Sequence, residues 1–159
     1  MPDESRPVAL VTGSATGVGR ACILQFAQRG YDVVVNYSRS EQDARQTAAD
    51  AEALGAKTLV ICCDVADNAA VRQMITKIND TFGRLDALVN NAATTTFIEH
   101  GNLDALTEEM WDRMLAVNLK GAFFVTRAAA DLLRASGAGS VVNVSSVAAM
   151  TGSGSSIAY

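Results

Sequence analysis

The sequence predicts an α/β protein built on a doubly wound parallel sheet. Short and almost continuously apolar runs alternate along the chain with helical stretches of ten or more residues. Such runs are typical of parallel strands buried on both faces, and the intervening stretches are long enough for right-handed helical crossovers. In this class of fold, ligands bind at the carboxyl ends of the strands. The carboxyl ends are therefore where functional residues are expected.

Strands are expected at residues 8–11, 31–36, 57–62, 85–90 and 140–145. The first helix follows the first strand, and its periodicity places on one face Ile23, Phe26, Ala27 and Gly30. The second helix begins near Ser40 and ends at Gly55, and its buried face is expected to carry Ala44, Thr47, Ala48, Ala51 and Leu54. A third helix is expected at residues 68–82, and a long helical stretch at 107–135. Residues 91–104 and 146–156 are expected to be loops.

Composition bounds the function. The 159 residues are expected to form one domain (1–159), and 49% hydrophobic residues can fill its core. A net charge of −4 argues against a nucleic-acid partner. No apolar run approaches the ~18 residues needed to span a bilayer, so a membrane is not expected as a partner either. The polar segment at residues 1–7 differs from a signal peptide, so we expect a cytoplasmic protein. The cysteines, Cys62 and Cys63 among them, suit neither disulfides nor a metal site, so we expect small buried side chains and no metal.

Three glycines follow the first strand, with the spacing Gly13, Gly17, Gly19. A strand, a glycine turn and a helix N-terminus in that order form a site for a phosphate-bearing ligand, because N–H groups and the positive end of the helix dipole converge there. Glycine is required where a Cβ would hold a pyrophosphate away or block a positive φ. A glycine-rich turn with no ligand is the alternative.

Polar residues occur at the end of each expected strand. They are found at residues 12–19, 36–39, 64, 90–91 and 145–146. Taken singly, each has an ordinary explanation as a turn, a loop residue or a helix cap. Because the carboxyl ends of parallel strands lie at one edge of the sheet, we expect these residues to converge on a single crevice.

These residues resemble the short-chain dehydrogenase/reductase family, in its single-domain, ketoacyl-reductase-like branch, which has a Rossmann-type fold. The segment Thr12-Gly13-x-x-x-Gly17-x-Gly19 is similar to the family's cofactor loop, and Asp64-Val65 to its adenine-contacting pair. Asn90-Asn91-Ala92-Ala93 is similar to its Asn-Asn-Ala-Gly turn, with alanine in the last place. The resemblance implies a dinucleotide site formed by Gly13, Ser14, Thr16, Gly17, Val18, Gly19, Asn36, Tyr37, Ser38, Arg39, Asp64, Val65, Asn91, Ala92 and Ala93.

The same resemblance implies catalytic residues. Asn118, Ser146 and Tyr159 match the family's asparagine, serine and tyrosine, and Tyr159 lies 13 positions after Ser146. The implied reaction interconverts a small-molecule carbonyl and an alcohol by hydride transfer, with NAD(P) as cofactor. Tyr159 would act as general acid/base, and Ser146 would donate a second hydrogen bond to the same oxygen. Asn118 would relay protons through water from an interrupted helix.

The end of the second strand bears on the choice of cofactor. NAD-binding proteins of this kind place a carboxylate there to hold the ribose 2′-OH. This chain has Asn36-Tyr37-Ser38-Arg39 instead, and a guanidinium binds a phosphate in a forked geometry. We therefore predict NADP in preference to NAD, with a solvated surface arginine as the alternative reading of Arg39.

The long helical stretch at 107–135 also bears on assembly and on the core. The segment 122–130 is apolar nearly all round, which predicts a helix face used in a homodimer or homotetramer, as is frequent in the family that the chain resembles. Met110, Trp111 and Met114 lie at helical spacing and are expected in the core.

The family's lysine, four positions after its tyrosine, would lie beyond residue 159. We therefore interpret the chain as the N-terminal portion of a longer protein, with the C-terminal part of the fold missing, and expect the 159 residues alone to be inactive.

Two alternative functions are open at this point. One is a non-catalytic module that binds a dinucleotide. The other is an isomerase of nucleotide sugars, although such enzymes usually space their glycines as G-x-x-G-x-x-G and are much longer.

Overall fold

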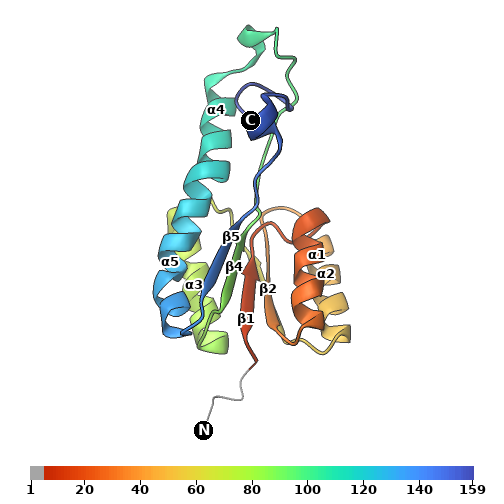
Figure 1. Cartoon of the computed structure of the whole chain (residues 1–159), viewed down its shortest axis with the longest axis vertical. Helices are drawn as coiled ribbons and strands as arrows, with labels where there is room; N and C mark the ends of the chain where they lie inside the picture. The colour runs from red at the N-terminus through yellow and green to blue at the C-terminus, as the bar shows by residue number, and fades with distance from the viewer. Residues whose placement is uncertain (1–5) are drawn as a thin grey trace.

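The computed structural model describes residues 6–159 and confirms the expected fold class; residues 1–5 of the polar N-terminal segment lie outside the described residues. A parallel five-stranded sheet carries helices on both faces (Figure 1). The strands are β1 (Val8–Val11), β2 (Asp32–Tyr37), β3 (Thr58–Cys62), β4 (Ala87–Asn90) and β5 (Ser140–Asn143). The helical elements are α1 (Gly17–Gln28), α2 (Glu41–Ala53), α3 (Asn68–Phe82), η1 (Leu103–Ala105), α4 (Glu108–Leu115), η2 (Ala116–Gly121), α5 (Ala122–Ala135) and α6 (Ala148–Thr151).

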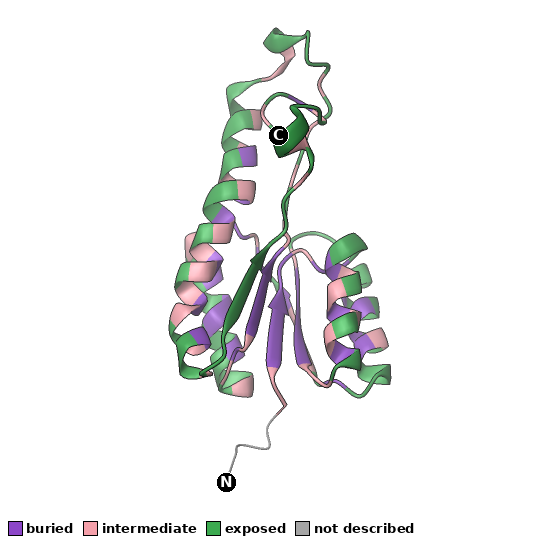
Figure 2. Cartoon of the chain, viewed as in Figure 1, coloured by how far each residue is buried: buried purple, intermediate pink, exposed green. Residues whose placement is uncertain are grey.

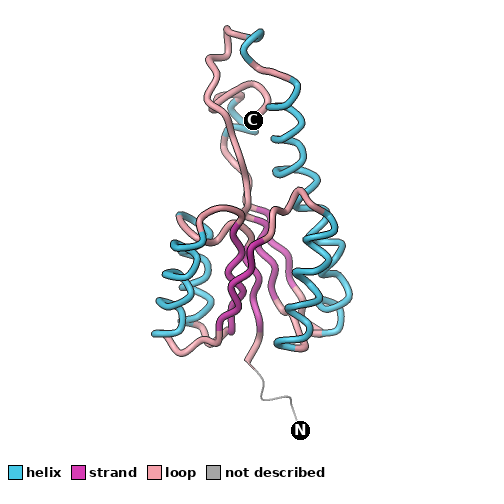
Figure 3. The backbone as a smooth tube through the Cα atoms, turned by 180° about the vertical axis from the view of Figure 1, so that it is seen from behind, coloured by secondary structure: helices cyan, strands magenta, loops and turns pink. Residues whose placement is uncertain are grey.

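The strand order β3-β2-β1-β4-β5 places the first strand in the centre of the sheet. Leu10 of β1 is in register with Val34 of β2 on one side and Leu88 of β4 on the other. The chain therefore winds outward from β1 in one direction as far as β3 and then crosses to β4 on the other side. Such a reversal opens a crevice beyond the carboxyl ends of β1 and β4. Seen from behind in Figure 3, the loops that follow the strands gather at this end of the sheet.

Two hydrophobic layers hold the helices to the sheet. On one face, Leu10 and Leu88 pack with Met74 and Ile78 of α3 and with Val125 of α5. On the other face, the core is formed by Val11, Val33, Val35, Ile23 of α1 and the alanines 44, 48 and 51 of α2. The small alanine side chains let α2 pack closely on this face. Figure 2 shows that burial is highest in the central strands.

Helix ends follow local capping chemistry. The third helix has the bounds expected from the sequence, because Asp67 Oδ1 accepts hydrogen bonds from the N–H groups of residues 69 and 70, and Gly83 ends the helix with a φ of +68°. Two residues expected on buried helix faces are not there. Gly30 lies beyond the end of α1 with a φ of +85°, and Leu54 is the C-cap of α2 and is exposed. In both cases the helix ends before the amphipathic pattern does.

The long helical stretch is interrupted in its middle by a π-helical turn. The turn is η2, and the α-helical segments α4 and α5 continue from its two ends. A π-turn inserts an extra residue, which rotates the faces of the flanking segments relative to one another and is frequent at functional sites. Met114 is buried as expected, whereas Met110 is half-buried and Trp111 is exposed, so the expectation of core positions is wrong for Trp111.

Other expectations need correction at the periphery. Strand β5 forms one edge of the sheet, and its residues are exposed rather than buried on both faces, as Figure 2 shows. The segment 146–156, expected to be a loop, contains the short helix α6. Cys63 is buried as expected, but Cys62 is exposed at the end of β3. Within residues 6–159, no helix combines the length and apolar character needed to cross a bilayer.

Candidate functional site

Two adjoining hollows lie at the carboxyl edge of the sheet. The first, the Tyr159 pocket, has a volume of about 200 Å³ and is lined among others by Asn118, Ser146 and Tyr159. The second, the Arg39 pocket, has a volume of about 300 Å³ and is lined among others by Arg39 and Asp64. Both are also lined by Val65 and by residues 91–93, so the two hollows share a wall, and we refer to the pair as the trough. The polar residues that follow the strands thus do converge, as the sequence predicted.

The three glycines of the loop after β1 are required for different structural reasons. A Cβ on Gly13 would lie 2.8 Å from Ala92 Cα, and a Cβ on Gly19 would lie 2.6 Å from Asn91 Nδ2. These two glycines allow the loop to pack against the turn after β4. Gly17 has a φ of +59°, and no described atom lies within 4 Å of its Cβ position. Its missing side chain leaves open space on the outer side of the loop, where a ligand would approach.

The N-terminus of α1 faces the trough without a protein anion to balance it. Among the residues that the structure describes, Thr16 makes no side-chain capping hydrogen bond, and the first turn contains no acidic residue. By contrast, α2 has Glu41 and Asp43 in its first turn, and α3 is capped by Asp67. An open N-terminus offers unpaired N–H donors and positive potential. Together with Gly17, it fits the pyrophosphate of a dinucleotide.

Thr12 and Asn91 join the ends of the two central strands. Thr12 Oγ1 accepts hydrogen bonds from the backbone N–H groups of Asn91 and Ala92, each at 3.0 Å. In return, Asn91 Nδ2 donates to Thr12 O at 2.9 Å and to Gly13 O at 3.0 Å. The Asn91 side chain therefore holds the start of the glycine loop against the turn after β4, and residues 91–93 of this turn line both hollows.

Asn36 lines the Arg39 pocket, but its side chain points into the fold. Its side chain is buried, where Oδ1 accepts from Gly13 N at 3.0 Å and Nδ2 donates to Cys63 O at 3.0 Å and Ile61 O at 3.3 Å. These bonds occupy the amide, so Asn36 ties β1, β2 and β3 together instead of presenting its amide to a ribose. Strand β2 ends one residue later, at Tyr37, and the exposed side chains that follow are those of Ser38 and Arg39.

Charge in the Arg39 pocket is arranged around Asp64. Asp64 Oδ2 accepts from Arg113 Nη1 at 2.7 Å, and Oδ1 accepts from the Ala66 N–H at 3.0 Å. Partial burial opposes ionisation, but these hydrogen bonds outweigh it and hold the pKa of Asp64 below its ordinary value. Beside it, burial and the Asp64 carboxylate raise the pKa of Cys63 to about 11, so this thiol stays neutral. Sequence reasoning missed Arg113, because spacing along the chain gives no sign that α4 reaches this pocket.

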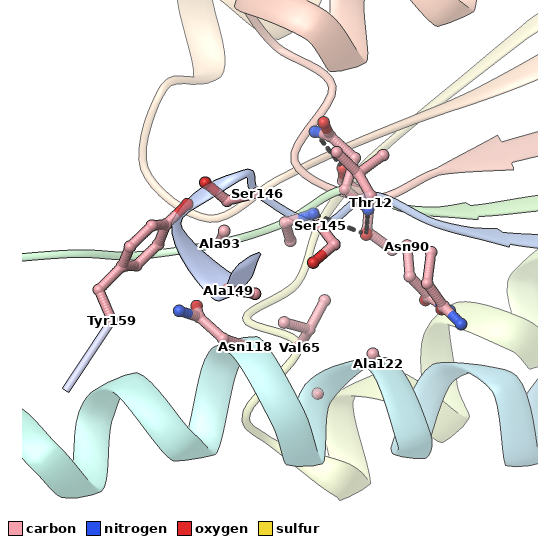
Figure 4. Close-up of a pocket in the computed structure, with 15 residues that line it drawn as sticks. Thr12, Val65, Asn90, Ala93, Asn118, Ala122, Ser145, Ser146, Ala149 and Tyr159 are labelled. Carbon is pink, nitrogen blue, oxygen red and sulfur yellow. Dashed lines mark hydrogen bonds between the residues drawn. The ribbon is translucent and has the colours of Figure 1, made fainter. Parts of the chain in front are cut away.

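The Tyr159 pocket brings together the hydroxyl groups of Ser146 and Tyr159, which point toward each other in Figure 4. Ser146 follows β5, and its Oγ accepts a hydrogen bond from the Ala148 N–H at 3.1 Å. Because Oγ is the acceptor in that bond, the hydroxyl proton of Ser146 is left to donate to another group. Tyr159 is 43% exposed and lies at the mouth of the pocket.

Asn118 lies in the π-turn η2, so the expected interruption of the helix near this residue is confirmed. Its side chain pairs with the backbone of Thr94: Oδ1 accepts from Thr94 N at 2.8 Å, and Nδ2 donates to Thr94 O at 2.9 Å. Both polar atoms of the amide are therefore engaged in holding the segment that follows β4. Thr94, which sequence reasoning did not select, is the partner that defines this role.

Comparison with known proteins agrees with this geometry. Residues 7–159 match the family described as short chain dehydrogenase. The chain belongs to this family. A Streptomyces violaceoruber protein assigned as ketoacyl reductase 2 of the granaticin polyketide synthase is 44% identical over 96% of this chain and 60% of its own length. The L-rhamnose 1-dehydrogenase (NAD(P)(+)) of a Sphingomonas species is 40% identical over 90% of this chain and 56% of its own length. The chain thus spans little more than half the length of these relatives.

Solved structures of short-chain dehydrogenases share the fold. A Burkholderia xenovorans protein assigned to the short-chain dehydrogenases/reductases aligns with a TM-score of 0.95 and 40% identity, covering 99% of this chain and 66% of its own. A metagenomic short-chain oxidoreductase in complex with NADP aligns with a TM-score of 0.88 and 31% identity, covering 98% of this chain and 68% of its own. NAD+-bound xylitol dehydrogenase aligns with a TM-score of 0.89 and 25% identity, covering 99% and 59%. These neighbours support a nicotinamide dinucleotide as cofactor.

The packing of Gly19 against Asn91 predicts a loss of stability on substitution. We expect Gly19→Ala to lower the free energy of unfolding by about 1–3 kcal/mol, because the added methyl group would overlap the Asn91 amide. Gly101→Ala is the matched control, since the Cβ position there meets no described atom within 4 Å. Urea denaturation of both variants measures the difference. Equal stability of the two would contradict the close contact.

Proposed function

We propose that the protein is an NADP-dependent oxidoreductase that interconverts a carbonyl and an alcohol, with Tyr159 as general acid/base. The observation that carries the proposal is that Ser146 and Tyr159 line one pocket with their hydroxyls pointing toward each other (Figure 4), next to the pocket that Gly13 of the glycine loop lines. The bound nicotinamide cofactor would supply or accept the hydride. Because the chain spans only 60% of the ketoacyl reductase that it matches, the activity is proposed for the full-length protein.

The two hydroxyls act on one substrate oxygen. In the direction of reduction, negative charge develops on the carbonyl oxygen, and the Tyr159 hydroxyl donates its proton there. Ser146 donates a second hydrogen bond to the same oxygen, using the proton that its contact with Ala148 leaves free. In the oxidative direction, Tyr159 accepts the proton of the alcohol. Preorganised donors of this kind typically contribute 10²- to 10³-fold each, or about 3–4 kcal/mol.

Asn118 is proposed to relay protons through water, as the resemblance implies, and its amide also has a positioning role. Its amide holds Thr94, and the segment after Thr94 is bound in turn to the chain just before Tyr159. Ile98 N donates to Ser155 O at 2.7 Å, and His100 Nε2 lies 3.1 Å from Gly154 O. We therefore place the side of the pocket that meets the substrate between these two segments. The relatives' names include a sugar dehydrogenase and a 3-oxoacyl-[acyl-carrier-protein] reductase, which supports a small-molecule carbonyl or alcohol as substrate class.

The proposed preference for NADP rests on the Arg39 pocket. Two guanidinium groups, those of Arg39 and Arg113, line it with a single carboxylate, that of Asp64. No acidic residue occupies positions 36–39, where a carboxylate would repel a 2′-phosphate. The relatives include proteins named for NAD(P)(+) and structures with either NADP or NAD+, so the family alone does not select one cofactor.

We also propose that the long helical stretch mediates assembly with a second copy of the chain. Its outer side carries the exposed side chains of Leu115, Leu119 and Phe123, at intervals of four residues. These exposed apolar side chains form a stripe along α4, η2 and the start of α5, while Val125 and Ala129 face the sheet. An exposed apolar stripe of this kind is typical of an interaction surface.

Removal of the Tyr159 hydroxyl tests the catalytic proposal. Tyr159→Phe keeps the ring and deletes the proton donor, so we expect kcat for carbonyl reduction by NADPH to fall at least about 100-fold. Tyr31→Phe is the matched control, because its ring packs on Phe26 away from the trough. The Kd for NADPH, measured by fluorescence, should change little in both. A full-length wild type that binds NADPH but turns over no substrate in a broad carbonyl panel would favour the non-catalytic binding module.

Removal of the Arg39 charge tests the cofactor proposal. Arg39→Ala should weaken NADPH binding by about 10- to 150-fold, the loss of a charged hydrogen bond worth about 1.5–3 kcal/mol. NADH has no 2′-phosphate, so its Kd should remain within about two-fold. Arg45→Ala is the control, because this arginine is paired with Glu41 on α2. Equal losses of NADPH and NADH affinity in Arg39→Ala would assign the residue to the fold instead.

A charge placed in the apolar stripe tests the assembly proposal. We expect Phe123→Glu to shift the full-length protein toward smaller species in sedimentation velocity, because a carboxylate would be buried in the contact. Leu103→Glu serves as the control, since Leu103 is equally exposed but lies in η1, away from the stripe. An unchanged sedimentation profile for Phe123→Glu would place the assembly surface elsewhere.

A further inference from the structure

Arg113 is the one residue of α4 among those found to line the Arg39 pocket. It lies on α4, which extends beyond the carboxyl edge of the sheet (Figure 1). Its guanidinium reaches Asp64 in the turn after β3. The Nη1–Oδ2 distance is 2.7 Å, and both side chains are about 40% exposed at the rim, at 41% and 38%. The ion pair is therefore part of the wall of the pocket and remains accessible to a bound ligand.

Asp64 lies between two cations but is hydrogen-bonded to one of them. Arg39 lines the same pocket from the segment after β2, and its charge contributes to the low pKa of Asp64. The hydrogen bonds of the carboxylate are made with Arg113 and with the Ala66 N–H. Arg39, by contrast, has an exposed side chain at the end of β2. The Arg39 side chain is thus exposed in the pocket, while the Asp64 carboxylate is paired with Arg113.

We propose that Arg113 is an indirect determinant of cofactor specificity: by binding Asp64, it keeps that carboxylate from competing with the cofactor's 2′-phosphate for Arg39. The inference rests on the proposed use of NADP. It assigns a function to the ion pair that stability alone would not require, since a half-exposed pair contributes little to folding.

The expected effect follows from the charges. With Arg113 present, the pocket's two guanidiniums and one carboxylate sum to a single positive charge that favours a phosphate. Without it, an unpaired carboxylate would repel the 2′-phosphate and attract Arg39, and the sum would be zero. Between exposed groups such effects are moderate and are screened by salt. A loss of about ten-fold in affinity for the 2′-phosphate is expected at low ionic strength.

A purely structural role for Arg113 would have different consequences. Arg113 lies five positions before Asn118, so its loss could instead displace η2 and weaken every ligand alike. The two roles are separated by removing the carboxylate as well. If Arg113 acts by neutralising Asp64, its substitution should have no selective effect once Asp64 is uncharged.

The test is a double-mutant cycle with two small probes. Calorimetry would measure the Kd of 2′,5′-ADP and of 5′-AMP for the full-length wild type, Arg113→Gln, Asp64→Asn and the double variant. The measured quantity is the preference for 2′,5′-ADP over 5′-AMP. We expect Arg113→Gln to reduce this preference about ten-fold, and Asp64→Asn and the double variant to retain at least the preference of the wild type. Arg134→Gln, which breaks an exposed pair with Asp131 on α5, should change nothing.

Several outcomes would overturn the inference alone. These are an equal loss of both probes in Arg113→Gln, an unchanged preference in that variant, or a double variant no better than Arg113→Gln. A wild type that binds 5′-AMP as tightly as 2′,5′-ADP would overturn the proposed use of NADP, and this inference with it. Because the wild type and the variants are measured separately, the two failures are distinguishable.

Discussion

The hydrogen bonds between Thr12 and Asn91 hold together the part of the molecule on which the site depends. They join β1 to β4, the two strands between which the winding of the sheet reverses. The same Asn91 amide meets the glycine loop at Gly13, and the absence of a side chain at Gly19 makes room for it. The position of α1, and with it the open helix N-terminus, therefore depends on a few polar contacts between the ends of β1 and β4. The hydrophobic layers stabilise the sheet, but these contacts set the shape of the trough.

The sequence predicted what depends on local pattern and could not predict what depends on orientation across the fold. The bounds of α3 follow from Asp67 and Gly83, two residues adjacent to the helix itself. The inward direction of Asn36 depends instead on where Gly13 and Cys63 lie in space, and the contact of Arg113 with Asp64 joins residues 49 positions apart. The exposure of β5 likewise depends on which elements cover its two faces, which its apolar sequence does not reveal. The roles carried over by resemblance for Ser146 and Tyr159 stay predictions, although the structure brings both into one pocket.

The turn at Asp64 and Val65 links the two halves of the trough. Asp64 binds α4 before the π-turn, and Val65 packs at Gly121 at its end, where a Cβ would lie only 2.7 Å from Val65 Cγ2. Asn118 lies between these two points of attachment. The wall that carries Asn118 is thus positioned by the same turn that borders the Arg39 pocket.

The backbone contacts of Ile98 with Ser155 and of His100 with Gly154 have a consequence for how such a protein can diversify. They tie the segment after β4 to the stretch of chain that leads into Tyr159. A substitution that moves one of these two segments is therefore expected to move the other, so under the proposed function the substrate-facing wall and the position of Tyr159 would change together. New specificities in this scaffold would then arise most readily from side chains that leave these backbone bonds intact, such as Phe97, whose ring projects almost fully into solvent.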